Sequence, residues 1–144
     1  KDFFCNNLFY LPFRQKHLRC GIIDYQDAFW GDEILDIVSL FEDSRRIIND
    51  DSKFKLIDYY LKETNQIKHK EEFIAKFNFI GAARQTRLLG RWIKLQKFTN
   101  KSQYLNYLNT TWYWLENNLN NYFLEELKNL YSDLIPYTKR RYED

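Results

Sequence analysis

Three polar residues near the start of the sequence have the types and the spacing that a phosphoryl-transfer site requires. Asp2 is followed five residues later by Asn7, and Asp24 closes a short apolar run. Phosphoryl transfer needs a carboxylate that orients and deprotonates the acceptor hydroxyl, and it needs hard oxygen ligands that hold Mg²⁺ against the phosphates. An acid, an amide and a second acid in this order supply those groups.

Each of these residues has an ordinary structural explanation when it is taken alone. An aspartate near a chain end is usually a solvated surface residue, and an asparagine such as Asn7 is common in turns and at strand edges. Asp24 has the position of a turn residue or a helix cap. The occurrence of all three together is what favours chemistry over these alternatives.

The element that must bring them together is a β-hairpin. Residues 8–12 and 18–23 are short runs rich in aromatic and aliphatic side chains, and residues 13–17 between them are polar and basic. This pattern predicts two antiparallel strands. Asn7 and Asp24 then lie on the two arms of one hairpin, where an amide oxygen and a carboxylate can converge on one ion.

After the hairpin, apolar residues recur at spacings of three and four, which predicts helices. Asp32 is placed to cap the first helix and Ser52 the second. The helical pattern covers, in order, residues 34–41, 54–61, 71–96, 104–119 and 122–131. The sequence therefore predicts a mainly α fold of the α+β class, a small hairpin followed by about five helices, without the alternating strands and helices of a doubly wound sheet.

The composition fits one domain and argues against several classes of function. The 144 residues are 44% apolar, enough to bury a core. A net charge of +2 predicts no nucleic-acid partner, and no apolar run approaches the ~20 residues that a membrane span needs. Cys5 and Cys20 make no disulfide framework and indicate free thiols in a reducing cytosol, so we expect a cytoplasmic protein.

The parts that would bind a nucleotide are not found in the sequence. Its four glycines do not cluster, so there is no Gly-rich phosphate-binding loop, and no strand lysine stands in the context that pairs with phosphates. The sequence contains no Met and begins with Lys1. We therefore expect residues 1–144 to be the metal and acceptor lobe of a longer protein, with the N-terminal nucleotide-binding lobe absent.

The order Asp-x-x-x-x-Asn, hairpin, apolar-apolar-Asp resembles the C-terminal lobe of the aminoglycoside phosphotransferase family, relatives of protein kinases and choline kinases. The run from Gly21 to Ala28, Gly-Ile-Ile-Asp-Tyr-Gln-Asp-Ala, is most similar to the bacterial sugar kinases of that family. Those enzymes phosphorylate the anomeric position of N-acetylmuramate and N-acetylglucosamine in peptidoglycan recycling. The resemblance is specific over residues 1–46, looser over residues 80–108 and absent beyond.

The resemblance implies the cofactors and the central roles. Asp2 matches the catalytic aspartate, the general base or substrate-orienting group, and Asn7 and Asp24 match the two Mg²⁺ ligands. ATP is the implied phosphoryl donor, and the implied partner is a small-molecule acceptor, a sugar.

Three further roles follow from the same resemblance. Gln26 and Asp27 match a segment that lines the acceptor side, and Asp36 matches an aspartate that braces the catalytic loop through hydrogen bonds to its backbone. The sequence departs from the sugar kinases at Phe4, where they usually have His, and at Asn6, where they usually have Asp. Neither change removes a metal ligand, but both alter the acceptor side.

Two arginine pairs have the chemistry to meet an anionic acceptor such as the lactyl carboxylate of muramic acid. They are Arg45 with Arg46 and Arg84 with Arg87. Ordinary solvated helix faces are the more common explanation for both pairs.

The sequence thus predicts a fragment of an ATP-dependent phosphotransferase that phosphorylates an amino-sugar hydroxyl by direct in-line transfer and is inactive on its own. Two alternatives stay open. One is a kinase for aminoglycosides or choline-like alcohols, and the other is a non-catalytic, kinase-like interaction module.

Overall fold

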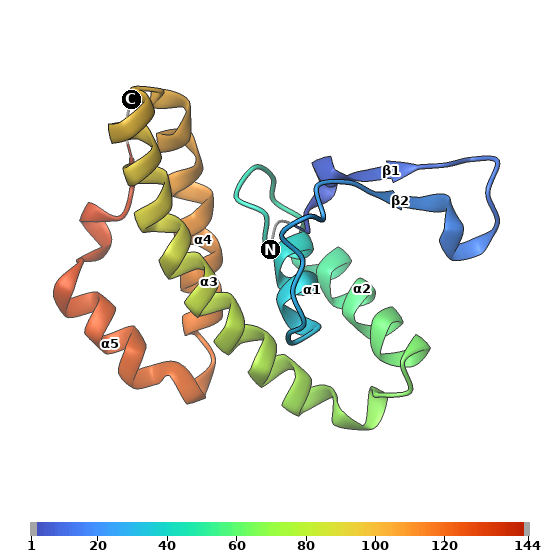
Figure 1. Ribbon diagram of the computed structural model, residues 1–144. Helices are drawn as coiled ribbons and strands as arrows, with labels where there is room; N and C mark the ends of the chain where they lie inside the picture. The colour runs from blue at the N-terminus through green and yellow to red at the C-terminus, as the bar shows by residue number, and fades with distance from the viewer. Residues whose placement is uncertain (1–2, 143–144) are drawn as a thin grey trace.

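The computed structural model describes residues 3–142, so the predicted catalytic residue Asp2 lies outside the described residues. Within them the fold is mainly α, with the predicted hairpin followed by five α-helices (Figure 1). The hairpin consists of β1 (Leu8–Tyr10) and β2 (Cys20–Ile22). The helices are α1 (Ile34–Phe41), α2 (Asp50–Glu63), α3 (Lys70–Thr99), α4 (Leu108–Leu119) and α5 (Glu125–Leu134).

The hairpin extends away from the helices (Figure 1), and most of its side chains are exposed. Its strands are antiparallel, with Leu8 opposite Ile22 and Tyr10 opposite Cys20. Neither strand contributes a residue to the apolar clusters found among residues 3–142. The pairing therefore serves mainly to fix the positions of the residues at the open end of the hairpin.

The first apolar core joins α1 and α2 to the first half of α3. Ile34, Val38 and Phe41 are spaced by four and three residues, so they share one face of α1. That face is buried against α2 and α3, where the cluster continues with Ile57, Leu61, Phe73 and Phe77. Each such side chain, when fully buried, stabilises the fold by about 1.5–3 kcal/mol.

Side chains of residues just before α1 and α2 accept hydrogen bonds from the first backbone N–H groups of these helices. The cap predicted for α1 is displaced by one residue, because Glu33 holds the N-cap position. Asp32 lies just before it, and its carboxylate accepts a hydrogen bond of 3.0 Å from the backbone N–H of Ile34. The cap predicted for α2 is wrong. Asn49 takes that place, because its side-chain oxygen accepts a hydrogen bond of 2.8 Å from the backbone N–H of Ser52, three residues later.

The second core lies further along α3, from Ala82 to Leu89, and this helix is long enough to reach both clusters (Figure 1). Its buried residues come from α3, α4 and the turn before α5, namely Ala82, Leu89, Trp112, Leu115, Leu119 and Leu124. Leu127 and Tyr131 of α5 are partly buried against them. None of the helices within residues 3–142 combines the length and the apolar character needed to cross a membrane.

Candidate active site

The hairpin brings the two predicted metal ligands together. The backbone N–H of Ile23 donates to the carbonyl of Asn7 at 3.0 Å, which extends the pairing by one step beyond Leu8 and Ile22. Asp24 follows directly, and its carboxylate oxygen Oδ2 lies 3.4 Å from the side-chain nitrogen Nδ2 of Asn7. Asn7 is 8% exposed, so its amide is held in place within the protein.

Asp24 adopts a left-handed backbone conformation, with φ of 59°. Aspartate and asparagine tolerate this region better than other residues with a side chain. The chain turns away at that point, and the Gln26 amide donates a hydrogen bond of 2.6 Å to Oδ1 of Asp24. The two carboxylate oxygens of Asp24 are thus contacted by Asn7 on one side and by Gln26 on the other.

The other two predicted site residues lie at the surface. Asp27 is exposed in the turn after Gln26, and Asp36 is exposed on α1. No hydrogen bond joins the Asp36 side chain to the backbone of residues 3–7, the part of the predicted catalytic loop that the structure describes. The role of Asp36 in bracing that loop, and the place of Asp27 on the acceptor side, stay predictions.

Asn7 and Asp24 provide the donor set that Mg²⁺ prefers, an amide and a carboxylate with hard oxygen atoms. Within residues 3–142 there is no cluster of three or more His, Cys, Asp or Glu side chains that could hold a metal ion. A site built from these two residues fits a magnesium ion that takes the rest of its coordination from substrate phosphates and water, as Mg²⁺ commonly does.

Asp24 lies at the edge of a pocket of about 310 Å³ between the hairpin end, the connection from α1 to α2, and α3. The Arg45 guanidinium stacks over the Phe4 ring at 4.0 Å and pairs with Asp43 at 2.9 Å. The other residues that line the pocket are Ser44, Arg84, Leu88, Arg91, Trp92, Leu95 and Tyr104.

Arg84 enters this pocket from α3, and the explanation of a solvated helix face is wrong for it. Its side chain is half-buried, and burial lowers the pKa of its guanidinium to about 10. One terminal nitrogen donates to the carbonyl of Glu42 at 3.2 Å, whereas Nε is buried without a hydrogen-bond partner. Arg87, its predicted companion, is exposed and does not line this pocket. It lines a neighbouring hollow that Arg84 also borders.

Sequence reasoning missed Arg91, although a signal for it was present. Arg84, Leu88, Arg91 and Leu95 follow one another at i, i+4, i+7 and i+11, which is the spacing of one helix face. All four line the pocket. The helical periodicity that predicts the apolar core of α3 therefore also predicts which residues of α3 line the pocket.

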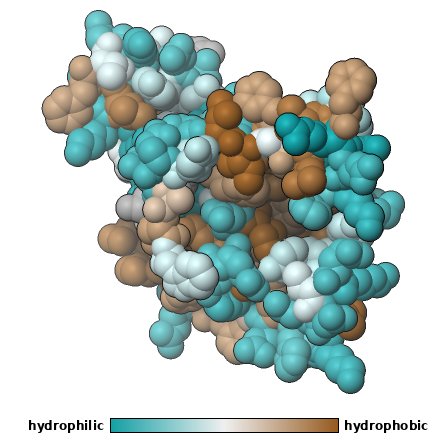
Figure 2. Space-filling model, turned by 45° about the vertical axis from the view of Figure 1, so that its right-hand side comes forward, coloured by the Kyte–Doolittle hydropathy of each residue, from teal (hydrophilic) through white to brown (hydrophobic). Residues whose placement is uncertain are grey.

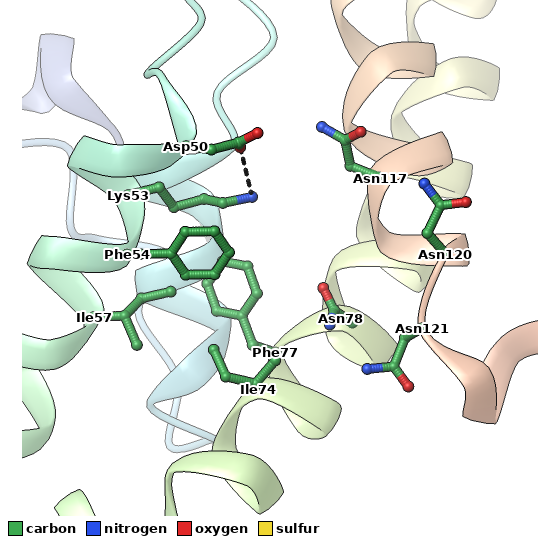
Figure 3. Close-up of a pocket in the computed structure, with 10 residues that line it drawn as sticks. All are labelled: Asp50, Lys53, Phe54, Ile57, Ile74, Phe77, Asn78, Asn117, Asn120 and Asn121. Atoms are coloured by element: carbon green, nitrogen blue, oxygen red, sulfur yellow. Dashed lines mark ion pairs between the residues drawn. The ribbon is translucent and has the colours of Figure 1, made fainter.

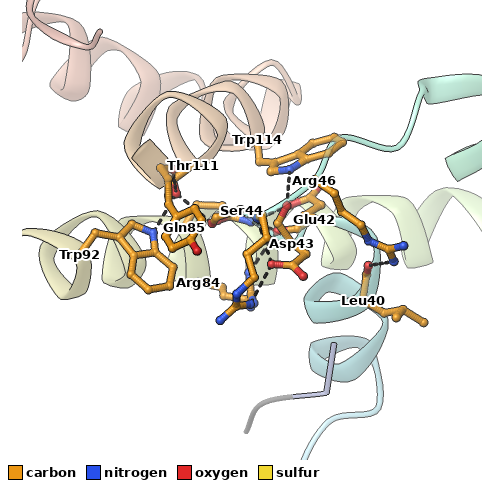
Figure 4. A network of polar contacts seen from close by, with 12 residues as sticks. Leu40, Glu42, Asp43, Ser44, Arg46, Arg84, Gln85, Trp92, Thr111 and Trp114 are labelled. Carbon is orange, nitrogen blue, oxygen red and sulfur yellow. Dashed lines mark hydrogen bonds and ion pairs between the residues drawn. The ribbon is translucent and has the colours of Figure 1, made fainter. Parts of the chain in front are cut away.

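A buried polar network holds the wall in position (Figure 4). It centres on Glu42, which is fully buried, and burial raises the pKa of its carboxyl. The carboxylate accepts a hydrogen bond of 2.7 Å from Asn118 on α4 and lies 3.7 Å from the Lys53 ammonium on α2. The Glu42 carbonyl accepts from Gln85 at 3.0 Å as well as from Arg84. Three helices thereby fix the segment that continues into the pocket.

The next two residues of this segment are fixed by α4. Asp43 and Ser44 are 2% exposed, and the indole N–H of Trp114 donates to the carbonyl of Asp43 at 3.4 Å. The hydroxyl of Ser44 lies 2.8 Å from that of Thr111. Thr111 in turn accepts a hydrogen bond of 3.0 Å from the indole N–H of Trp92. The pocket wall is therefore part of the folded core.

A second hollow, of about 320 Å³, lies between α2, α3 and the end of α4 (Figure 3). Asp50 and Lys53 form an ion pair of 3.7 Å on its α2 side. Four asparagines line the opposite side, namely Asn78, Asn117, Asn120 and Asn121. This hollow contains none of the residues that the sequence marks for chemistry.

A search against models of protein families found no match. Among curated proteins, the chain is similar to the N-acetylmuramate/N-acetylglucosamine kinase of Caulobacter vibrioides, with 28% identity over 141 residues. This chain has a kinase as a distant relative. The similarity covers 98% of the chain and 39% of the relative, so the chain spans about two fifths of the length of the protein that it matches.

Proposed function

We propose that this protein is a phosphotransferase that transfers a phosphoryl group from ATP to a hydroxyl of an amino sugar, and that this chain is its metal and acceptor lobe. The proposal rests on one observation, that the Asn7 amide and the Asp24 carboxylate lie in contact beside the pocket. The similarity to a kinase named for two amino sugars supports it.

In this proposal Asp2 orients the acceptor hydroxyl and takes its proton, and transfer is direct and in line. Asn7 and Asp24 would hold Mg²⁺, and the bound ion would neutralise charge on the transferring phosphoryl group. Gln26 keeps the Asp24 carboxylate oriented, as its hydrogen bond of 2.6 Å indicates. Asp27 would lie on the side of the site that binds the acceptor sugar.

The surface of the hairpin region supports the presence of a further, nucleotide-binding lobe. Figure 2 turns this side of the molecule forward and shows apolar patches among hydrophilic side chains. Large apolar side chains are exposed throughout residues 9–30, among them Tyr10, Phe13, Tyr25, Phe29 and Trp30. Extended apolar surface of this kind commonly marks an interface, and we propose that the nucleotide-binding lobe covers it.

The same surface favours one competing function, a non-catalytic kinase-like module that binds a protein partner through the hairpin. The two functions differ in their response to nucleotide. Titration calorimetry of the complete natural protein with ATP should give heat that depends on Mg²⁺ if the protein is a phosphotransferase. A module without catalysis should give none.

The direct test of the proposal is phosphorylation by the complete natural protein. ATP, Mg²⁺ and either N-acetylglucosamine or N-acetylmuramate are incubated with it, and the sugar phosphate is followed by ³¹P NMR. We expect product with at least one of the sugars, and the variant Asp2→Ala should bind ATP but lose several orders of magnitude in turnover. Turnover near the wild-type value in that variant would refute the proposed role of Asp2.

A further inference from the structure

We propose that Arg84 and Arg91 form an oxyanion-binding site in the wall of the Asp24 pocket. The site would bind a carboxylate or phosphate group of a bound substrate. The identity of that substrate rests on the proposed function, whereas the binding of an anion rests on the geometry alone.

The Arg84 side chain has unused hydrogen-bonding capacity at a half-buried position. No ion pair between residues 3–142 includes it, and its Nε is buried without a hydrogen-bond partner. A buried donor left unpaired costs stability. Because burial lowers the pKa of Arg84 only to about 10, the side chain stays charged at neutral pH. An anion in the pocket would accept the hydrogen bond that Nε lacks and would neutralise the half-buried positive charge.

Arg91 adds a second guanidinium to the same wall. It lies seven residues after Arg84, two turns further along α3, and it is exposed where it lines the pocket. Among the described residues it has neither a hydrogen bond nor an ion pair through its side chain. A ligand can therefore recruit it without breaking an existing contact.

The other charged groups of the pocket leave an excess of positive charge on its wall. Arg45 is paired with Asp43 at 2.9 Å, and the Asp24 carboxylate is contacted by Asn7 and Gln26. Arg84 donates only to a backbone carbonyl, and Arg91 has no side-chain partner among the described residues. With Arg45 paired to Asp43, these two arginines stand against the single carboxylate of Asp24, so the pocket favours a negative ligand over a neutral one. A guanidinium offers paired N–H donors that match the two oxygens of a carboxylate or phosphate.

Two sources can supply the oxyanion, and the two sugars distinguish them. N-acetylmuramate carries a lactyl carboxylate that N-acetylglucosamine lacks, so a site for the acceptor's carboxylate affects only the first sugar. A site for a phosphate of the nucleotide affects both sugars equally and raises the KM for ATP.

The experiment compares Arg84→Gln and Arg91→Gln with the wild type in the complete protein. The control is Arg87→Gln, which removes an exposed arginine of the same helix that does not line the Asp24 pocket. We expect the first two variants to lose roughly ten- to hundredfold in kcat/KM, the loss typical of a hydrogen bond to a charged group, and the control to lose nothing. A loss restricted to N-acetylmuramate identifies the carboxylate, and an equal loss with a raised KM for ATP identifies a phosphate.

Kinetics like those of Arg87→Gln for both variants would overturn the proposal. Arg91 is at the surface, so its variant tests the site even where Arg84→Gln is poorly folded. Titration calorimetry with N-acetylmuramate or inorganic phosphate gives a readout that needs no turnover. If the wild type phosphorylates neither sugar but binds an anion that both variants fail to bind, the proposed function fails and the anion site stands.

Discussion

The contact between α3 and α4 makes Gly81 a sensitive test of the network around Glu42. Gly81 is buried on α3, and a Cβ atom added there would lie 2.5 Å from Nδ2 of Asn118 and 2.8 Å from its Cγ and Oδ1. Real Cβ atoms do not approach other atoms so closely, so Gly81→Ala must displace the Asn118 side chain. That side chain donates the hydrogen bond of 2.7 Å to the buried Glu42 carboxylate.

The size of the effect follows from two opposing contributions. A hydrogen bond to a charged group contributes about 1.5–3 kcal/mol, and that contribution is lost when Asn118 moves. Alanine is favoured over glycine within a helix by about 1 kcal/mol, which offsets part of the loss. The free energy of unfolding should therefore fall by about 0.5–2 kcal/mol. Crowding at the contact between the helices adds to this decrease.

The matched control is Gly90→Ala on the same helix, where an added Cβ has no atom within 4 Å. Only the helix preference acts there, so this variant should be more stable than the wild type by up to about 1 kcal/mol. Urea unfolding followed by tryptophan fluorescence measures both variants. If Gly81→Ala is as stable as the wild type or more stable, Asn118 is not held as the structure shows.

Three further predictions concern the metal, its supporting residue and pH. Removal of Mg²⁺ with EDTA should abolish sugar phosphorylation by the complete protein and added Mg²⁺ should restore it; activity that persists in EDTA would contradict the metal site. Gln26→Ala should weaken the apparent affinity for Mg²⁺ by roughly 10–100-fold, because Gln26 orients the Asp24 carboxylate. An unchanged Mg²⁺ dependence of the rate would contradict this orienting role. The hydrogen bond from Lys76 holds the pKa of Asp32 below its ordinary value of 3.8. The contribution of the ionised Asp32 carboxylate to the stability of the fold is therefore present above that pH, and it is lost as the pH falls through the lower pKa of the folded state. In urea unfolding at several pH values, the stability advantage of the wild type over Asp32→Asn should shrink in this acidic range, and an advantage independent of pH would refute the assignment.

The hairpin and the helices could be predicted because their signals are local. Apolar alternation and helical periodicity depend on residues within one or two turns of each other, and the hairpin pairing places Asn7 near Asp24. The sequence pattern predicts Ser52 as the cap of α2, three residues after the actual cap, Asn49, and within the same polar segment. Such shifts at helix ends are common, since several neighbouring residues can serve as the cap.

The buried segment at Glu42 could not be predicted in the same way. The run Glu-Asp-Ser-Arg-Arg at residues 42–46 has the composition of a surface loop. It is buried because Gln85 and Asn118 approach Glu42 from helices 43 and 76 residues further along the chain. For the same reason, the partial burial of Arg84 beside this segment could not be predicted.

The central claim, that Asp24 holds the metal for phosphoryl transfer, is tested most directly by replacing it. The measurement is the rate of sugar phosphorylation at saturating ATP and Mg²⁺ in the complete protein, for the wild type, Asp24→Ala and the control Asp133→Ala, an exposed acid on α5. Loss of a direct ligand should exceed the effect of losing an orienting residue, so we predict a decrease of more than about a hundredfold for Asp24→Ala and none for the control. A rate for Asp24→Ala within a few fold of the wild type, with the fold intact by circular dichroism, would contradict the claim.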